Sequence, residues 1–306
     1  MDFSLSGTVL TRDLVAADGR VVAAKGEIVD LSRLKDAALK APREPRDRPL
    51  FETGCAESVL EAFESPPLQF VVGTEGLRAA AADVLSNVRF PEPVWDEMEA
   101  LKREDTPRYQ HAIWTAVVSA RLFRTALGTA PGLARLVGGA LVHDVGMRHA
   151  GARLRFKREH LTASEAQTLE DHPLLGALLL ASVLGDAPAV HFALLHHTPA
   201  GLGYPRGTQG KPPLRGLDLV SVSSAFAALI GQRTYRTQAF NARGAIDQLL
   251  EESAAGRFDP RAVYLLIHCL RGGNGASAEL VLPRKPTGFR PPVNHHGVGP
   301  ETRLSA

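Results

Sequence analysis

The chain has 306 residues, 44% of them hydrophobic and 22% charged, with a formal net charge of +2 at pH 7. This length accommodates two domains with packed cores, and the nearly balanced charge argues against a nucleic-acid or membrane partner. Cys55 and Cys269 form no CxxC pattern, the N-terminus lacks the features of a signal peptide, and no apolar run is long enough to cross a membrane. We therefore expect a reduced, cytoplasmic protein.

Residues 1–88 predict a small α+β domain. Short strands and turns precede a helix over 32–40, and the apolar run "LQFVVG" (68–73) is typical of a buried strand that leads into a second helix. A loop rich in proline and charge, 41–54, separates the two parts. The region contains no pattern of catalytic or metal-binding residues, so we expect it to serve regulation or dimerisation.

Residues 89–271 follow a helical pattern throughout. The predicted helices cover 93–104, 108–127, 131–146, 163–183, 187–197, 214–230, 242–254 and 259–270. Together the two regions predict a mainly α fold, with an all-helical domain after a small α+β domain. Residues 272–306 are rich in proline and glycine and poor in apolar side chains, which predicts a disordered tail.

Histidines gather on the apolar faces of four consecutive predicted helices. They are His111, His143, His172, His196 and His197, and Asp144 directly follows His143. A single histidine on an apolar face is more often a core residue, but five of them with a carboxylate are costly to bury unless a cation binds them. Neutral imidazole is the commonest metal ligand. The pattern favours a divalent metal site; the alternatives are one structural metal, or a scaffold without any.

The order of these motifs resembles the HD-GYP family of the HD phosphohydrolase superfamily, over roughly residues 95–240. The resemblance rests on "RYQHAIWTA" around His111, "LVHDVG" (141–146), "LTASEAQTLEDHPLLG" (161–176), "LLHHTPAGLGYPRG" (194–207) and "SSAFAALIGQRTYR" (223–236). The 29-residue spacing between His143 and His172 also fits. The resemblance implies an all-helical, HD-type metal phosphohydrolase domain. In this family two or three metal ions, usually iron or manganese, activate a water that hydrolyses cyclic di-GMP.

The resemblance also implies a role for each motif residue. One metal would take His111, His143 and Asp144, and a second would take Asp144 as a bridge together with His172, His196 and His197. His143 and Asp144 would be the catalytic residues of the motif. The residues implied beside the substrate are the signature loop, Gly203, Tyr204 and Pro205. The side chains that we expect to meet its phosphate are Lys157, Arg233 and Arg236, with Arg148 as a further candidate.

Several positions depart from the family pattern where that pattern carries charge. Members commonly have a lysine at the position of Met147. At two positions where members have carboxylate ligands, this chain has Ser224 and Pro107. Three further acidic positions are occupied by Thr198, Ala200 and Ala227. Loss of a ligand weakens a metal site strongly. We therefore expect one ion, at the site of His172, His196 and His197, and at most two.

Two functions remain open from the sequence. The first is a degenerate, metal-binding member of the cyclic di-GMP phosphodiesterase family, with impaired or altered catalysis and a signalling role. The second is an active metal-dependent phosphodiesterase that hydrolyses cyclic di-GMP or a related phosphoester. The partners compatible with both are cyclic di-GMP or a related nucleotide, a protein docked on the Gly-Tyr-Pro loop or the N-terminal domain, and a second copy of the chain. The loss of several charged positions together favours the first function.

Overall fold

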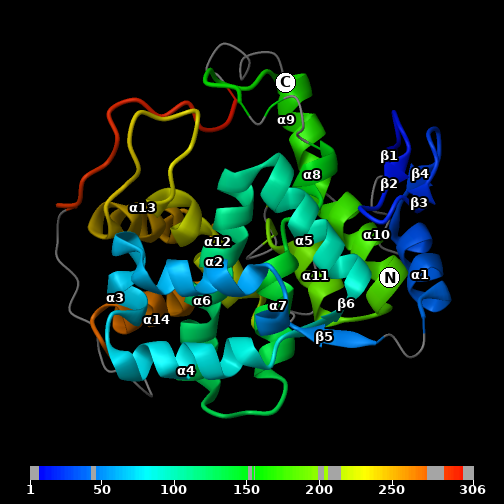
Figure 1. Ribbon diagram of the computed structural model, residues 1–306. Helices are drawn as coiled ribbons and strands as arrows, with labels where there is room; N and C mark the ends of the chain where they lie inside the picture. The colour runs from blue at the N-terminus through cyan, green and yellow to red at the C-terminus, as the bar shows by residue number, and fades with distance from the viewer. Residues whose placement is uncertain are drawn as a thin grey trace.

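The computed structural model describes residues 7–42, 46–150, 154, 156–198, 203–205, 215–273 and 286–298. Within these ranges the chain is mainly α-helical, and its strands are short and confined to the first hundred residues (Figure 1). The prediction of a mainly α fold with a small α+β region at the N-terminus is therefore confirmed. No helix in the described ranges is long and apolar enough to cross a membrane.

The strands form three short antiparallel pairs, in which β1 pairs with β4, β2 with β3, and β5 with β6. Their bounds are β1 Thr8–Val9, β2 Leu14–Val15, β3 Val21–Ala23, β4 Ile28–Val29, β5 Asp47–Pro49 and β6 Arg89–Pro91. The strand predicted over 68–73 is wrong, because Gln69–Val72 forms the short helix α3 after a 3₁₀ turn. A short, fully buried apolar run is compatible with either structure, and only its packing against neighbouring helices decides between them.

Helices make up the rest of the described chain. Their bounds are α1 Leu31–Lys40, α2 Cys55–Glu64, α3 Gln69–Val72, α4 Glu75–Ser86, α5 Glu92–Glu104, α6 Thr106–Leu127, α7 Leu133–Val142, α8 Met147–Ala150, α9 Ala163–Glu170, α10 His172–Leu184, α11 Pro188–Leu195, α12 Leu217–Ile230, α13 Ala242–Ala254 and α14 Pro260–Leu270. The long helix α6 is central, because α2, α4, α5, α7, α12 and α14 all pack against it. One continuous hydrophobic core includes residues from the N-terminal region and from the helical region.

The predicted helix 163–183 is two helices, α9 and α10, which meet at Asp171. Pro173 causes the break, since it has no N–H to donate to the carbonyl of Leu169 four residues earlier. The imidazole of His172 takes over that role, with its Nδ1 atom 2.5 Å from the Leu169 oxygen. The proline thus places His172 in the first turn of a new helix and fixes the orientation of its ring.

Part of the predicted disordered tail has a defined position. Residues 287–290 lie against α13, where the buried carboxylate of Asp247 accepts hydrogen bonds from the N–H groups of Thr287 and Gly288 at 2.9 and 2.8 Å. Arg290 forms a two-pronged ion pair with Glu251. Composition alone missed this segment because backbone hydrogen bonds to a distant side chain attach it, with little help from apolar burial.

The N-terminal region is attached to the helical region through a buried carboxylate. Glu97 on α5 accepts a hydrogen bond from the N–H of Ala17 at 2.6 Å and pairs with Arg148 at 3.0 Å. Burial alone would raise the pKa of Glu97, but the neighbouring His149 imidazole, 3.8 Å away, and the charge of Arg148 lower it below its usual value. Because Arg148 belongs to α8, this network links the N-terminal strands to the helix directly after "LVHDVG".

We expect Glu97→Gln to lower the free energy of unfolding by about 3 kcal/mol at pH 7, because it removes the buried partner of the Arg148 guanidinium and leaves only Glu104, whose side chain is 31% exposed. The folded-state pKa of Glu97 lies below the unfolded-state value, so its contribution is complete above about pH 4.5 and is lost as the pH falls through the folded value. Urea unfolding at pH 7 and pH 4 measures both effects. Glu92→Gln, which removes an exposed partner of Arg48, is the control and should cost less than about 1 kcal/mol. Equal losses in the two variants would contradict the prediction.

Candidate metal centre

Five histidines and one aspartate converge from four parts of the chain. They are His111 on α6, His143 and Asp144 directly after α7, His172 at the start of α10, and His196 and His197 directly after α11. All of them are buried except His197, which is half-buried. They form two groups, called here the His111 group (His111, His143, Asp144) and the His172 group (His172, His196, His197). Within each group the ligand atoms lie within 4.8 Å of one another.

Two glycines allow the elements that carry Asp144 and His172 to approach each other. A Cβ atom on Gly146 would lie 2.0 Å from the backbone oxygen of His172 and 2.5 Å from the backbone nitrogen of Gly176. Neither distance is sterically tolerable, so the chain after α7 contacts α10 backbone to backbone. As a result, Asp144 Oδ1 lies only 3.2 Å from His172 Nε2.

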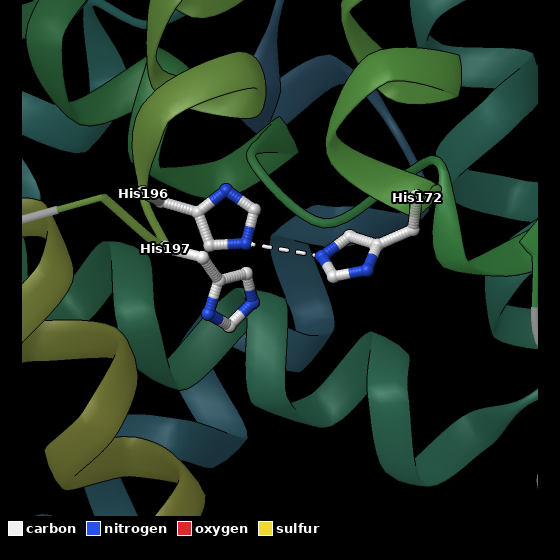
Figure 2. A group of neighbouring side chains, drawn as sticks. All are labelled: His172, His196 and His197. Carbon is white, nitrogen blue, oxygen red and sulfur yellow. Dashed lines mark hydrogen bonds between the residues drawn. The ribbon is translucent and has the colours of Figure 1, made fainter. Parts of the chain in front are cut away.

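The two inner imidazoles of the His172 group point the same ring nitrogen at each other. The Nε2 atoms of His172 and His196 are 3.2 Å apart (Figure 2). The Nδ1 atoms lie 2.5 Å from the Leu169 carbonyl and 3.0 Å from the Ala193 carbonyl, so each Nδ1 carries the ring's proton and donates it. Because a neutral imidazole has only one N–H, two lone pairs face each other. This arrangement is unfavourable alone and becomes favourable when both nitrogens bind a cation.

The carboxylate of Asp144 lies between the two groups. Its Oδ1 atom is 3.2 Å from His172 Nε2 and 3.9 Å from His196 Nε2, while its Oδ2 atom is 3.9 Å from Arg108 Nη1. Burial alone would raise the pKa of Asp144, but the neighbouring His143 and Arg108 lower it to about 2. The group is therefore charged at neutral pH and supplies the His172 group with a negative ligand.

A serine hydroxyl closes the His111 group. Ser224 Oγ lies 3.1 Å from His143 Nε2 and 3.3 Å from His111 Nε2. The Nδ1 of His143 is 2.7 Å from the Ala140 carbonyl and donates to it, so His143 accepts at Nε2. The buried Nδ1 of His111 has no hydrogen-bond partner among the described residues. His111 therefore lacks the outer hydrogen bond that orients metal-binding imidazoles.

Burial keeps the imidazoles in the form that binds metal. It lowers the pKa of His196 to about 4, and it lowers the pKa values of His111 and His172 well below 6.5. At His111 the positive charge of Arg233 is the next largest cause of the lowered pKa. Neutral imidazole is the ligand form, so at neutral pH protons do not compete for these nitrogens.

The Gly-Tyr-Pro loop packs on the His172 group. Gly203 has φ +104°, and a Cβ there would lie 2.0 Å from the His197 carbonyl oxygen, so only glycine fits. The next residue, Tyr204, stacks its ring on that of His197, with centroids 4.5 Å apart and an interplanar angle of 25°. The ring of His172 lies 6.0 Å from Tyr204, edge to face. Tyr204 and Pro205 are half-buried, so this loop forms one wall of the cluster.

Of the cationic side chains predicted to meet a phosphate, two are engaged elsewhere. Lys157 pairs with Glu165, which also caps the first turn of α9. Arg236 is buried and donates to the carbonyls of Ala228 and Gly231 at the end of α12. A third candidate, Arg148, lies in the Glu97 network. Arg233 differs from them, because it interacts electrostatically with His111, His143 and Asp144.

The sequence interpretation missed Arg108. It lies on the first turn of α6, three residues before His111, and that spacing places both side chains on one face of the helix. Asp105, the cap of the same helix, holds the guanidinium at 3.3 Å, and Asp144 lies on its other side. The spacing to His111 was the available signal, but an arginine in the first turn of a helix is usually solvated.

The positions that depart from the family pattern add no acidic ligand. Pro107 is exposed in the first turn of α6, and Met147 and Ala227 are buried. Thr198 donates its hydroxyl to the Leu195 carbonyl, and Ala200 lies outside the described residues. The His172 group with Asp144 therefore fits a divalent ion, with three imidazoles and a carboxylate. The His111 group fits one poorly, because its only carboxylate is shared and a neutral hydroxyl replaces the other.

Comparison with known proteins identifies the class. Residues 133–262 match the HD domain family, which supports membership of the HD phosphohydrolase superfamily. The matched stretch begins at α7 and contains every residue of the cluster except His111.

Two curated relatives are similar to this chain. The cyclic di-GMP phosphodiesterase PdeB of Borreliella burgdorferi is 26% identical over 167 residues, which cover 52% of this chain and 42% of the relative. The 3'3'-cGAMP-specific phosphodiesterase 1 of Vibrio cholerae is 27% identical over 128 residues, which cover 42% of this chain and 30% of the relative. The chain thus spans less than half the length of the curated relatives it matches.

We expect Gly146→Ala to abolish metal binding at the His172 group, because the new methyl group would force α10 away from Asp144. The matched control is Gly76→Ala on α4, where a Cβ meets nothing within 4 Å and the fold should be unaffected. Elemental analysis after metal loading measures the ion content of both, and far-ultraviolet circular dichroism checks their helix content. Full metal content in a folded Gly146→Ala protein would contradict the proposed packing.

We expect the metal-free protein to lose stability as the pH falls from 6.5 to about 4. The pKa of His196 is lower in the folded state, so the unfolded chain binds more protons in this window and acid favours unfolding. A bound divalent ion needs the neutral imidazoles, so its stabilisation is largest at neutral pH and declines in acid. Thermal melts at pH 7.5, 6.5, 5.5 and 4.5, with and without metal, measure both trends. A melting temperature independent of pH across this range would contradict the prediction.

Proposed function

We propose that this chain is a degenerate HD-GYP-type protein that holds one divalent ion, iron or manganese, at His172, His196, His197 and Asp144. In this proposal it binds a cyclic dinucleotide, cyclic di-GMP or a relative, and hydrolyses it slowly or not at all. The observation that carries the proposal is the pair of Nε2 lone pairs that face each other at 3.2 Å beside the Asp144 carboxylate. A buried cation is the simplest way to stabilise them.

The two relatives support the class of ligand. Both are named as phosphodiesterases of cyclic dinucleotides. The residues around the cluster suit such a ligand, since Tyr204 offers an aromatic face at one wall and Arg233 a positive charge near His111. A signalling role follows if the protein responds to the messenger that its relatives hydrolyse.

The chain's own residues define how it would handle a phosphodiester. A bound divalent ion would polarise the phosphate and lower the pKa of a coordinated water. His172 and His196 are held in one tautomer by the Leu169 and Ala193 carbonyls, so their Nε2 atoms need no rearrangement to act as ligands. Asp144 supplies the negative charge, and Tyr204 restricts access to His197.

Slow catalysis follows from the charges that the His111 group lacks. Ser224 offers a neutral hydroxyl where the family pattern has an acidic ligand, and Met147 is a buried thioether where that pattern has a lysine. A second ion would therefore lack a second anionic ligand, and the phosphate would lack one cation. The alternative is an active phosphodiesterase acting on cyclic di-GMP or a related phosphoester. The complete His172 group and the Gly-Tyr-Pro loop favour this alternative. The measured turnover of cyclic di-GMP distinguishes it from the degenerate protein.

We also propose a regulatory role for the N-terminal region. The hydroxyl of Thr8 on β1 donates to Asp171 at 2.8 Å, directly before His172. Arg148, which follows the "LVHDVG" motif, donates to the Val15 carbonyl. A protein partner or a second copy of the chain that moved these strands would therefore act on both elements that carry the metal ligands.

Elemental analysis combined with a phosphodiesterase assay on one sample tests the proposal. We expect one iron or manganese ion per chain and little turnover of cyclic di-GMP. The His172→Ala variant should bind the ion at least about tenfold more weakly, since one ligand is removed. His191→Ala is the control, because the side chain of His191 on α11 is 42% exposed and pairs only with Asp186 among the described residues. Rapid turnover with two ions per chain would establish the alternative, and a chain without affinity for any divalent ion would refute the proposal.

A further inference from the structure

Two guanidinium groups flank the His111 group. Arg108 Nη1 lies 3.9 Å from Asp144 Oδ2, the carboxylate oxygen that does not face His172 and His196. Asp105 holds the same guanidinium from the other side at 3.3 Å. The side chain of Arg108 is 22% exposed, so the otherwise buried cluster is open to solvent beside it.

Arg233 brings a second positive charge to the same place. It interacts electrostatically with His111, Asp144 and Arg108. Its Nε atom is buried and has no hydrogen-bond partner among the described residues. A buried N–H of a guanidinium is costly to leave unsatisfied, so this donor is available for an acceptor that enters from outside the described chain.

These charges make the His111 group unsuitable for a divalent cation and suitable for an anion. A cation there would face Arg108 and Arg233, with two neutral imidazoles, the neutral Ser224 hydroxyl and one carboxylate that the His172 group already uses. The positive charges of Arg108 and Arg233 would repel a cation at this partly buried site. A phosphate oxygen would instead meet guanidinium donors, which recognise phosphate in a forked geometry.

We propose that the His111 group is a phosphate-binding site, in which Arg108 and Arg233 supply the positive charge that a second metal ion supplies elsewhere in the superfamily. This inference rests on the proposed function, because it assumes that the His172 group holds the single ion. The ligand it takes is the phosphodiester of the cyclic dinucleotide, bound through its non-bridging oxygens. Asp105 and Asp144 position Arg108.

The test uses the full chain loaded with manganese and titrated calorimetrically with inorganic phosphate and with cyclic di-GMP. We expect Arg108→Gln to weaken phosphate binding at least about tenfold, as for loss of a charge-assisted hydrogen bond, while the manganese content stays at one ion per chain. The matched control is Arg103→Gln on α5, whose side chain is 73% exposed and which removes the same net charge. Arg233→Gln, the second variant, should weaken binding like Arg108→Gln and serves where Arg108→Gln fails to fold.

A metal titration provides a readout that does not depend on phosphate. Ser224→Asp restores a carboxylate to the His111 group, and we expect the Arg108→Gln/Ser224→Asp protein to bind a second manganese ion at least about tenfold more tightly than Ser224→Asp alone. Phosphate binding unchanged in Arg108→Gln and Arg233→Gln would overturn the inference, as would a second manganese ion bound by the wild-type chain. A wild-type chain that binds phosphate through Arg108 but no metal would refute the proposed function and leave the phosphate site standing.

Discussion

The placement of one buried carboxylate determines the chemistry of this protein. Asp144 turns one oxygen to the lone pairs of His172 and His196 and the other to the guanidinium of Arg108. A single negative charge cannot neutralise a cation on each side, so the two sides compete for it. The His172 group, which presents three imidazoles, would use the carboxylate as a ligand for a bound ion. On the opposite side the guanidinium of Arg108 lies 3.9 Å from the second oxygen, and its positive charge reduces the attraction for another cation.

Backbone constraints far from the ligand atoms make this placement possible. Gly146 and Gly176 let two elements touch without side chains between them, and Pro173 starts a new helix at His172. The carbonyl that Pro173 leaves without a donor is the one that orients the His172 ring. A helix break and a ligand orientation are thus a single feature of the sequence. A backbone constraint also requires glycine at position 203, because any side chain there would collide with the His197 carbonyl.

Helical periodicity predicted the fold class, and the ordered spacing of histidines predicted the residues that the structure brings together as two groups. Other expectations depended on partners that are distant in the sequence. Lys157 and Arg236 have the charge expected of phosphate ligands, but Glu165 and the carbonyls at the end of α12 engage them. The run 68–73 is apolar enough for a strand or a helix, and its helical neighbours decide. Arg108 could not be distinguished from a solvated helix residue, because its partner Asp144 is 36 residues away.

The charge changes at the His111 group form one pattern rather than a series of separate losses. A site that exchanges an acidic ligand for Ser224 has less capacity to hold a divalent ion, and an arginine beside it removes what capacity remains. The same arginine returns the positive charge that a phosphate requires. In the proposed site Arg108 would replace a second metal ion in binding phosphate but not in catalysis, because a guanidinium does not activate water as a metal ion does. In the proposed function the protein would keep affinity for its ligand with little turnover, which is the behaviour required of a receptor for that ligand.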